Sequence, residues 1–187
     1  MRLGRKETRR LEIASTWNGV SLARDEVTLV SVYASGVVID APFYGDARPP
    51  GLGRHDRLWE YEVVEVFLAE GMEPSSRYVE LELGPHGHWL VLGFEGYRQV
   101  MELPDGVVVD YRASLHVGTA RRWRGELVLE PSWWQGVLER TRFANAYAIH
   151  EGRVVGLPGR RYGAAFAAPV DAERPDFHRT LHFGTFI

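Results

Sequence analysis

Five glutamates occupy a stretch of the chain that otherwise predicts three consecutive β-strands. The runs 58–68, 78–83 and 88–94 are rich in Val, Leu, Tyr, Phe and Trp, and turn-forming residues separate them. Strands favour β-branched and aromatic residues and are depleted in glutamate. The five acids are Glu60, Glu62, Glu65, Glu80 and Glu82. We therefore expect an antiparallel sheet with a polar patch, a pattern that by itself identifies neither a ligand nor a reaction.

Further strand-like runs follow one another along most of the chain, with turn residues about every 8–12 positions. This spacing predicts an all-β fold, an antiparallel β-sandwich or barrel. One short helix is expected near residues 132–139, where Pro131 suits the first turn. The other expected strands are 11–14, 27–34, 36–43, 107–117, 123–129, 145–150, 154–157 and 161–166.

The length of 187 residues is enough for one well-buried core. We expect residues 1–9 to form a flexible basic tail and residues 10–187 to form a single β-sandwich domain. The N-terminus is charged and no apolar segment of a secretory signal follows it, so a cytoplasmic location is expected.

Composition excludes several function classes. The net charge of -3 argues against a general nucleic-acid binder, which needs a basic face. Cysteine is absent, which rules out disulfides, thiolate metal sites and a cysteine nucleophile. No apolar run approaches the ~20 residues that span a bilayer, so no membrane partner is expected.

Strand alternation makes Glu65 the most unusual of the acids. Alternate side chains share a face, so Glu65 would lie beside Trp59, Tyr61, Val63 and Phe67, the more apolar set, which we expect to face the core. A carboxylate there must be paired or hydrogen-bonded, or it becomes neutral. An arginine partner and a role in capping loop amides both remain open. Arg98, at the end of the third strand, can reach Glu65 or a ligand.

The remaining acids are expected to form a cluster on the outer face of the sheet if the first two strands pair. Such a cluster of Glu60, Glu62, Glu80 and Glu82 could bind calcium, hydrogen-bond sugar hydroxyls, or pair with arginines across the sheet. The sequence does not decide among these three.

Histidines give a weaker signal. His86 and His88 lie two residues apart at a hairpin, without a third zinc ligand at a familiar spacing. Asp176 and His178 resemble an Asp/His pair, but no Gly-x-Ser-x-Gly elbow accompanies them, so Ser-His-Asp catalysis is not expected.

Several long motifs resemble an uncharacterised protein family that includes the vertebrate chromosome-four open-reading-frame type. They span nearly the whole chain: 17–19, 41–44, 58–67, 78–87, 145–150 and 175–178. More distantly, Val64-Glu-Val-Phe67 with the glutamate-rich strand and Pro-x-Gly turn is similar to DOMON-like domains and family 9 carbohydrate-binding modules. That resemblance implies a β-sandwich that binds sugars or, in some branches, haem.

We therefore predict a non-catalytic binding domain for a small polar ligand, most simply a saccharide or sugar derivative. Carboxylates and Arg98 would bind hydroxyls, and Trp59 would pack on a ring face. The alternatives are a glycan-active enzyme with two glutamates as acid and base, and a protein-interaction module. Calcium remains open as a cofactor, whereas haem is not expected because no methionine is paired with a histidine. The candidate ligand-binding residues are Trp59, Glu62, Glu65, Glu82, Arg98 and His150.

Overall fold

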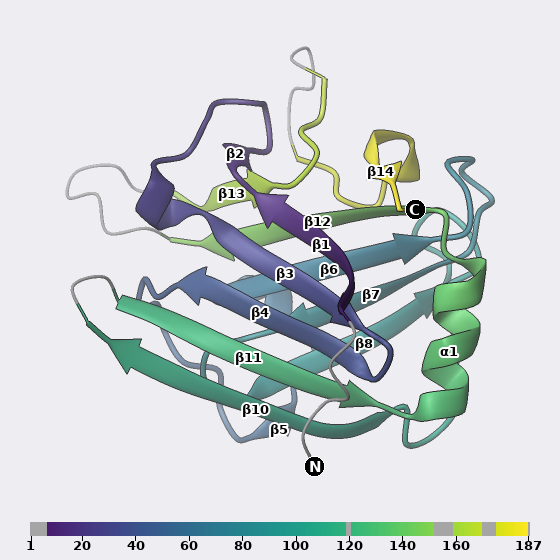
Figure 1. Cartoon of the computed structure of the whole chain (residues 1–187), viewed down its shortest axis with the longest axis horizontal. Coiled ribbons are helices and arrows are strands. Elements are labelled where there is room, and N and C mark those ends of the chain that lie inside the picture. Colours follow the sequence, from purple (N-terminus) through teal and green to yellow (C-terminus); the bar gives the residue numbers. More distant parts are fainter. Residues whose placement is uncertain (1–6, 119–120, 152–158, 170–174, 187) are drawn as a thin grey trace.

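Two β-sheets packed face to face form the molecule (Figure 1), in a computed structural model that describes residues 7–118, 121–151, 159–169 and 175–186. Nearly all neighbouring strands run antiparallel, and the pairing of β5 with β8 is parallel. The prediction of an all-β sandwich is confirmed. The strand expected at 154–157 lies outside the described residues.

The first sheet has five strands in the order β1-β3-β4-β11-β10. Residues 7–9, which we expected in a flexible tail, belong to its first strand. Gly36, in the tight turn between β3 and β4, has a φ of +149°, and a Cβ there would lie 1.9 Å from the carbonyl oxygen of Leu127, so only glycine fits. The bounds are β1 (Glu7–Ile13), β3 (Thr28–Tyr33), β4 (Gly36–Pro42), β10 (Val108–Val117) and β11 (Arg121–Leu129).

The second sheet has nine strands and contains the glutamate-rich stretch. Its main path is β2-β13-β12-β6-β7-β8-β5, with β14 added to β12 and β9 added to β8. The expected strand at 58–68 begins later than predicted, because residues 58–60 form the 3-10 helix η2 (Leu58–Glu60). The bounds are β2 (Ser15–Thr16), β5 (Gly53–Arg54), β6 (Val63–Ala69), β7 (Tyr78–Leu83), β8 (His88–Phe94), β9 (Val100–Met101), β12 (Phe143–His150), β13 (Arg161–Ala164) and β14 (Gly184–Thr185).

The main core lies between the two sheets and is built from the inward faces of both. It includes Val30, Ile39 and Leu127 from the first sheet and Val66 and Leu81 from the second, all fully buried. Burial of this apolar surface is the principal force that holds the sheets together.

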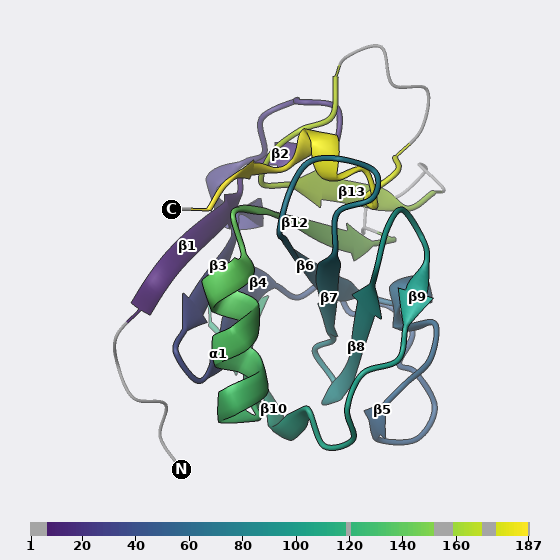
Figure 2. The same cartoon turned by 90° about the vertical axis from the view of Figure 1, so that its right-hand side faces the viewer.

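Helix α1 (Pro131–Arg140) crosses one end of the sandwich (Figures 1 and 2). The Glu130 carboxylate accepts hydrogen bonds from the amides of Ser132 and Trp133, which caps the N-terminus. Trp134 and Val137 bury themselves in the core between the sheets. The helix expected near 132–139 is confirmed. Two further 3-10 helices are η1 (Arg24–Glu26) and η3 (Thr180–His182).

The nine-stranded sheet is covered on both faces, and this corrects one expectation. All seven residues of β6 are buried. Val64, Val66 and Leu68 face the main core, whereas Phe67 belongs to a second apolar cluster on the opposite face, with Tyr147 and Phe183. We had placed the face of Glu65 and Phe67 toward the core. That assignment was wrong. The face of Glu65 and Phe67 is the more apolar one because C-terminal residues cover it, and the main core lies on the other face.

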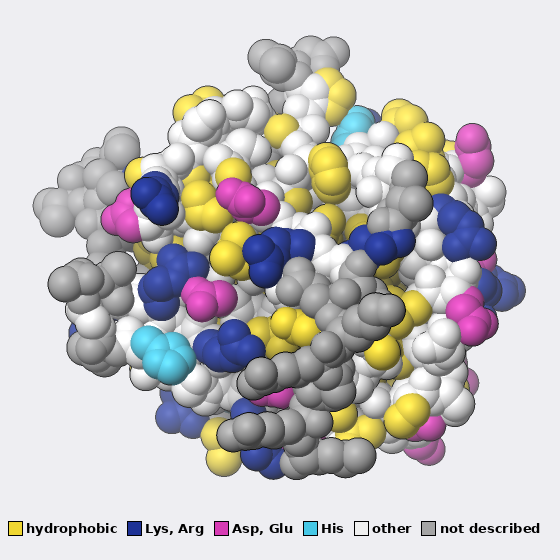
Figure 3. Space-filling model, in the orientation of Figure 1, with side chains coloured by type: hydrophobic (Ala, Val, Ile, Leu, Met, Phe, Trp, Pro, Cys, Tyr) yellow, Lys and Arg dark blue, Asp and Glu magenta, His cyan; other side chains and the backbone are white. Residues whose placement is uncertain are grey.

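The outer face of the five-stranded sheet carries arginines and acidic residues interspersed with hydrophobic side chains (Figure 3). The side chains of Arg122 and Asp40 form one such ion pair, with 2.6 Å between Nε and Oδ1. Among the described residues, none of the helices has the length and apolar character needed to cross a membrane.

Candidate functional site

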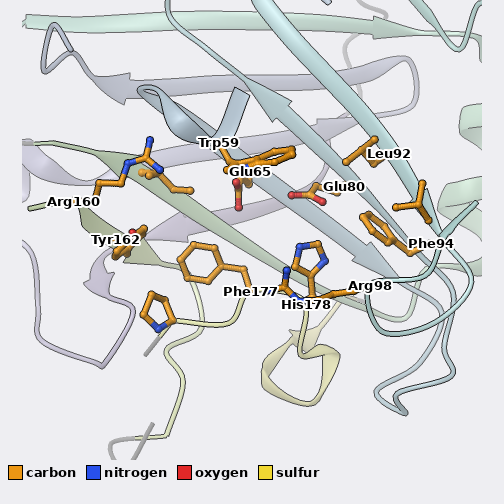
Figure 4. Close-up of a pocket in the computed structure, with 13 residues that line it drawn as sticks. Trp59, Glu65, Glu80, Leu92, Phe94, Arg98, Arg160, Tyr162, Phe177 and His178 are labelled. Carbon is orange, nitrogen blue, oxygen red and sulfur yellow. The ribbon is translucent and has the colours of Figure 1, made fainter. Parts of the chain in front are cut away.

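A pocket of about 390 Å³ lies over the second face of the nine-stranded sheet (Figure 4). Strands β6, β7 and β8 supply its floor, η2 supplies Trp59, and residues far apart in sequence supply the opposite wall. This volume lies within the ordinary range for small-molecule sites. The lining residues are Trp59, Glu65, Glu80, Leu92, Phe94, Arg98, Val100, Ile149, Arg160, Tyr162, Pro175, Phe177 and His178.

Three glutamates meet at the floor of this pocket. In the register of β6 and β7, Glu65 lies opposite Glu82, and Glu80 lies opposite Phe67, so the three acids share one face. One carboxylate oxygen from each acid lies within 4.8 Å of the others. The side chains are buried, with 3%, 3% and 0% exposure for Glu65, Glu80 and Glu82. We call these three residues the acid trio.

The acid trio differs from the acidic cluster expected from the sequence, which grouped Glu80 and Glu82 with Glu60 and Glu62 on an exposed face. Glu60 lies in η2 and pairs with Arg57. The strand register pairs Glu82 with Glu65 instead, and both faces of the sheet are covered.

Burial makes the acid trio hard to ionise. Desolvation raises the pKa of Glu65 to about 8, against the opposing effect of Arg160 and Arg98. Desolvation, and then the nearby Glu65, raises the pKa of Glu80 well above its ordinary value. Desolvation and the two neighbouring acids raise the pKa of Glu82 to about 10. Without a bound cation, these groups are therefore largely neutral at pH 7.

Neither carboxylate oxygen of Glu82 completes a hydrogen bond. The backbone N–H of Trp59 lies near enough to lower the pKa of Glu82, but this effect is smaller than that of desolvation. A buried polar group without a partner costs about 1–3 kcal/mol. The floor of the pocket thus contains hydrogen-bonding capacity that the protein itself does not use.

Of the two alternatives for Glu65, the arginine partner is not found, because no ion pair joins Glu65 to an arginine among the described residues. Arg98 Nη2 instead donates to Asp176 Oδ1 over 3.0 Å, and Arg98 adopts a left-handed φ of 55° in the turn after β8. Arg98 and Arg160 line the pocket and act on Glu65 only through their charge. Figure 4 shows them on opposite sides of the acids.

The wall opposite Trp59 comes from the C-terminal segment 175–178. The ring of Phe177 stacks on that of Tyr147, with centroids 3.9 Å apart. His178 Nδ1 and the Tyr78 hydroxyl are hydrogen-bonded at 2.9 Å. Burial lowers the pKa of His178 to about 4, so this imidazole is neutral at pH 7. The carboxyls of Glu65 and Glu80 lie between Trp59 on one side and Phe177 and His178 on the other (Figure 4).

Asp176 fastens this wall to the sheet. Its carboxylate accepts hydrogen bonds from the Tyr97 hydroxyl at 2.7 Å, from Arg98 Nη2 at 3.0 Å and from Arg179 Nε at 3.1 Å. These donors hold its pKa below the ordinary value in spite of partial burial. Asp176 and His178 therefore act as structural anchors, and each is hydrogen-bonded to other residues and not to the other member of the pair.

Four of the six candidate residues from the sequence come together here. Trp59, Glu65 and Arg98 line the pocket, and Glu82 completes the acid trio. Trp59 is 39% exposed, which leaves part of its indole ring accessible to a ligand.

Glu62 and His150 lie elsewhere, and their grouping with this site was wrong. Glu62 accepts hydrogen bonds from the amides of Tyr44, Gly45 and Asp46 at 2.8–3.2 Å, so it caps the loop after β4. His150 lies on the face of β12 opposite Tyr147, stacked on Tyr44 with ring centroids 3.5 Å apart. It lines a second cavity of about 420 Å³, near Trp17 and Arg161.

The site also contains residues outside the six candidates, although the sequence had marked Glu80 as part of an acidic cluster. Glu80, Arg160, Phe177 and His178 all line the pocket. The motif 175–178 was visible in the sequence, but nothing in it indicated that it crosses the glutamate-rich strands. The hairpin histidines are structural: His88 Nε2 lies 3.0 Å from the Gly51 carbonyl oxygen, and His86 packs edge-on against Phe43.

Chemically, the pocket offers neutral carboxyls that can both donate and accept hydrogen bonds, aromatic faces, and two guanidinium groups. The acid trio is also a set of oxygen ligands of the kind that hard divalent cations prefer.

A crystal structure of a "putative carbohydrate-binding protein" from Bacteroides uniformis has a similar fold. The TM-score is 0.59 at 18% sequence identity, with 95% of this chain and 85% of that chain covered. At this identity the likeness establishes the architecture.

Sequence comparison finds relatives over most of the chain, although no family model matches. The UPF0462 protein C4orf33 homolog of Mus musculus is 34% identical over 94% of this chain and 89% of its own length. The UPF0462 protein C4orf33 of Homo sapiens is 32% identical over 94% of this chain and 86% of its own length. The chain therefore belongs to the UPF0462 (C4orf33) family.

Proposed function

We propose that the pocket over the acid trio binds a small polar ligand, and that this ligand is a saccharide or a sugar derivative. The observation that carries the proposal is the placement of Glu65 and Glu80. Both carboxyls line a pocket of about 390 Å³, and neither is used by an arginine of the described chain. Hydroxyl groups of a sugar would supply their missing partners.

The aromatic side chains fit the same ligand class. Trp59 and Phe177 lie on opposite sides of the acids (Figure 4), and the apolar face of a sugar ring can pack on either. Arg98 and Arg160 would donate to hydroxyls, or to a carboxylate or phosphate on a sugar derivative. The Bacteroides uniformis neighbour is called a "putative carbohydrate-binding protein", and the resemblance to family 9 carbohydrate-binding modules and DOMON-like domains implies the same ligand class. A cytoplasmic location stays a prediction from the sequence.

A thermal-shift screen against mono- and oligosaccharides, sugar acids and sugar phosphates tests this proposal. A ligand at 100 times its Kd adds about 2.7 kcal/mol to the free energy of unfolding, which is about 5–11 °C in Tm for a chain of this size. The shift should vanish in Glu65→Gln and weaken in Arg160→Ala.

Matched controls come from the five-stranded sheet. Glu12 and Arg124 are exposed there, so Glu12→Gln and Arg124→Ala should respond like the wild-type protein. A sugar response that survives in Glu65→Gln would place binding elsewhere and refute the assignment of this pocket.

A glycan-active enzyme is the second candidate, because Glu65 and Glu80 converge in one pocket. Their oxygens lie within 4.8 Å, near the ~5–5.5 Å carboxyl separation of retaining glycosidases. That mechanism needs one ionised carboxylate as the nucleophile, whereas burial raises the pKa of both acids. Binding therefore ranks first. Release of a chromophore from aryl glycosides, lost in both Glu65→Gln and Glu80→Gln, would reverse this order.

A protein-interaction module remains the third alternative, and it requires a broad apolar surface. On the face shown in Figure 3, charged side chains separate the hydrophobic ones, which does not favour this alternative over a pocket ligand.

A further inference from the structure

The acid trio poses a problem of charge that a saccharide alone does not solve. Glu82 is completely buried, neither of its oxygens has a hydrogen-bond partner, and it lies beside Glu65 on the paired strand rather than among the pocket-lining residues. A sugar in the pocket could reach Glu65 and Glu80. The oxygens of Glu82 need a partner that fits between the three carboxyls.

Two kinds of partner fit between buried carboxyls: protons, or a cation. Protons relieve the repulsion but leave the Glu82 oxygens unpaired. A cation satisfies one oxygen of each residue at once, and it replaces the repulsion among the carboxylates by attraction to a common centre.

We propose that Glu65, Glu80 and Glu82 together bind one Ca²⁺ ion at the floor of the pocket. The three ligand atoms are all carboxylate oxygens, which suits Ca²⁺ and Mg²⁺ and does not suit Zn²⁺, which favours nitrogen and sulfur. The three ligand atoms lie within 4.8 Å of one another, close enough to share one ion. Ca²⁺ accepts a set of protein carboxylates in flexible geometry, whereas Mg²⁺ usually keeps several waters and binds through one or two carboxylates, so a site of three carboxylates suits Ca²⁺ better.

The surroundings leave room for the rest of the coordination sphere. Ca²⁺ takes six to eight oxygens, and three carboxylates can supply three to six of them, depending on how many bind through both oxygens. The remaining positions would face the pocket volume above Glu65 and Glu80, where water or ligand hydroxyls can coordinate. Among the described residues no ion pair joins Arg98 or Arg160 to the trio, and Arg98 donates to Asp176 instead, so no described guanidinium occupies the place of the cation.

This inference stands apart from the proposed saccharide binding, because Ca²⁺ would bind with or without a sugar. The test therefore uses the cation alone. After treatment with a chelator and dialysis, isothermal titration of the protein with CaCl₂ at pH 8 should give one site per chain. At 100 times the Kd, Ca²⁺ should raise Tm by about 5–11 °C.

Proton release gives a second readout. A carboxyl must be ionised to coordinate Ca²⁺, so binding displaces any proton that the trio holds. Titrations at pH 7 in two buffers of different ionisation enthalpy should show at least one proton released for each Ca²⁺ bound. Mn²⁺ provides a spectroscopic probe, because its free-ion paramagnetic resonance signal falls on binding and Ca²⁺ should restore it.

The decisive variant is Glu82→Gln, which removes one ligand that a pocket-bound sugar does not contact. Its Ca²⁺ affinity should fall at least tenfold, while Glu12→Gln should bind like the wild-type protein. The variant should fold, because it replaces a buried acid with a neutral amide of the same size. A wild-type protein that shows no Ca²⁺ response at millimolar concentrations, or a response that is unchanged in Glu82→Gln, would overturn the proposal. A saccharide response with no Ca²⁺ response would leave the proposed function standing and reject only the cation.

Discussion

Glu82→Gln also tests the electrostatics of the acid trio without any ligand. In the folded protein, desolvation and two neighbouring acids raise the pKa of Glu82 from 4.5 to about 10. In the unfolded chain the same carboxyl loses its proton near pH 4.5. Between these values the folded state holds one proton more than the unfolded state, so the free energy of unfolding decreases as pH rises. The contribution of this group is fully present below about pH 4.5 and is lost progressively up to about pH 10.

The magnitude follows from the linkage of one proton. One proton held only by the folded state makes the free energy of unfolding fall with each pH unit in that window, so Glu82 alone should lower it by about 3 kcal/mol between pH 6 and pH 8. Glutamine cannot titrate. The variant should therefore lose stability less steeply, and it should be more stable than the wild-type protein at pH 8 while differing little at pH 5.

Urea unfolding at pH 5, 6, 7 and 8, with a chelator present throughout, measures these slopes. Glu12→Gln should run parallel to the wild-type protein, because Glu12 is exposed on the five-stranded sheet. Parallel curves for Glu82→Gln and wild type would refute the reasoning, since they would mean that Glu82 is ionised in the folded protein. Ca²⁺ should reverse the wild-type trend, because it favours the ionised trio.

Two further predictions concern the framework of the site. Asp176→Ala removes the carboxylate that accepts hydrogen bonds from Tyr97, Arg98 and Arg179. It should lower the free energy of unfolding by about 1–2 kcal/mol and weaken ligand binding in the thermal-shift assay. Unchanged binding would show that this anchor does not position the pocket. Trp134→Ala leaves a cavity between the sheets and removes the hydrogen bond from Nε1 to the Tyr33 carbonyl oxygen. Urea unfolding should show that the free energy of unfolding falls by about 3–5 kcal/mol. The exposed control Arg124→Ala should lie within about 0.5 kcal/mol of wild type.

The architecture could be predicted because it depends on local patterns. Alternating apolar residues and regular turns indicate an antiparallel sandwich, and Pro131 marks the first turn of α1. The first residue of β6 was harder to predict from the sequence. Residues 58–60 have a strand-like composition, yet Arg57 takes a left-handed φ of 65° and the chain turns through η2 before Val63.

The site could be predicted only in part, because two of its determinants are not local. Alternation correctly places Glu65 and Val64 on opposite faces of the strand. It does not say which face meets the main core when both faces are buried. Pairing register decides that Glu82 joins Glu65 rather than Glu62, and a register is set by contacts along the whole strand. Phe177 and His178 complete the pocket from about a hundred residues away in the chain, a placement that no short pattern reports.

The same register places three acids where they do not help folding. Apolar residues at positions 65, 80 and 82 would extend the two apolar clusters that contain Phe67 and Leu90 and would cost no desolvation. Such replacements of buried charged groups are often neutral or stabilising. The chain instead places three carboxyls on one face of two paired strands and leaves the oxygens of one of them without a hydrogen bond. A fold alone gains nothing from that arrangement. A ligand that coordinates all three carboxyls recovers the cost of their burial, and it does so at the floor of the pocket where a sugar would bind.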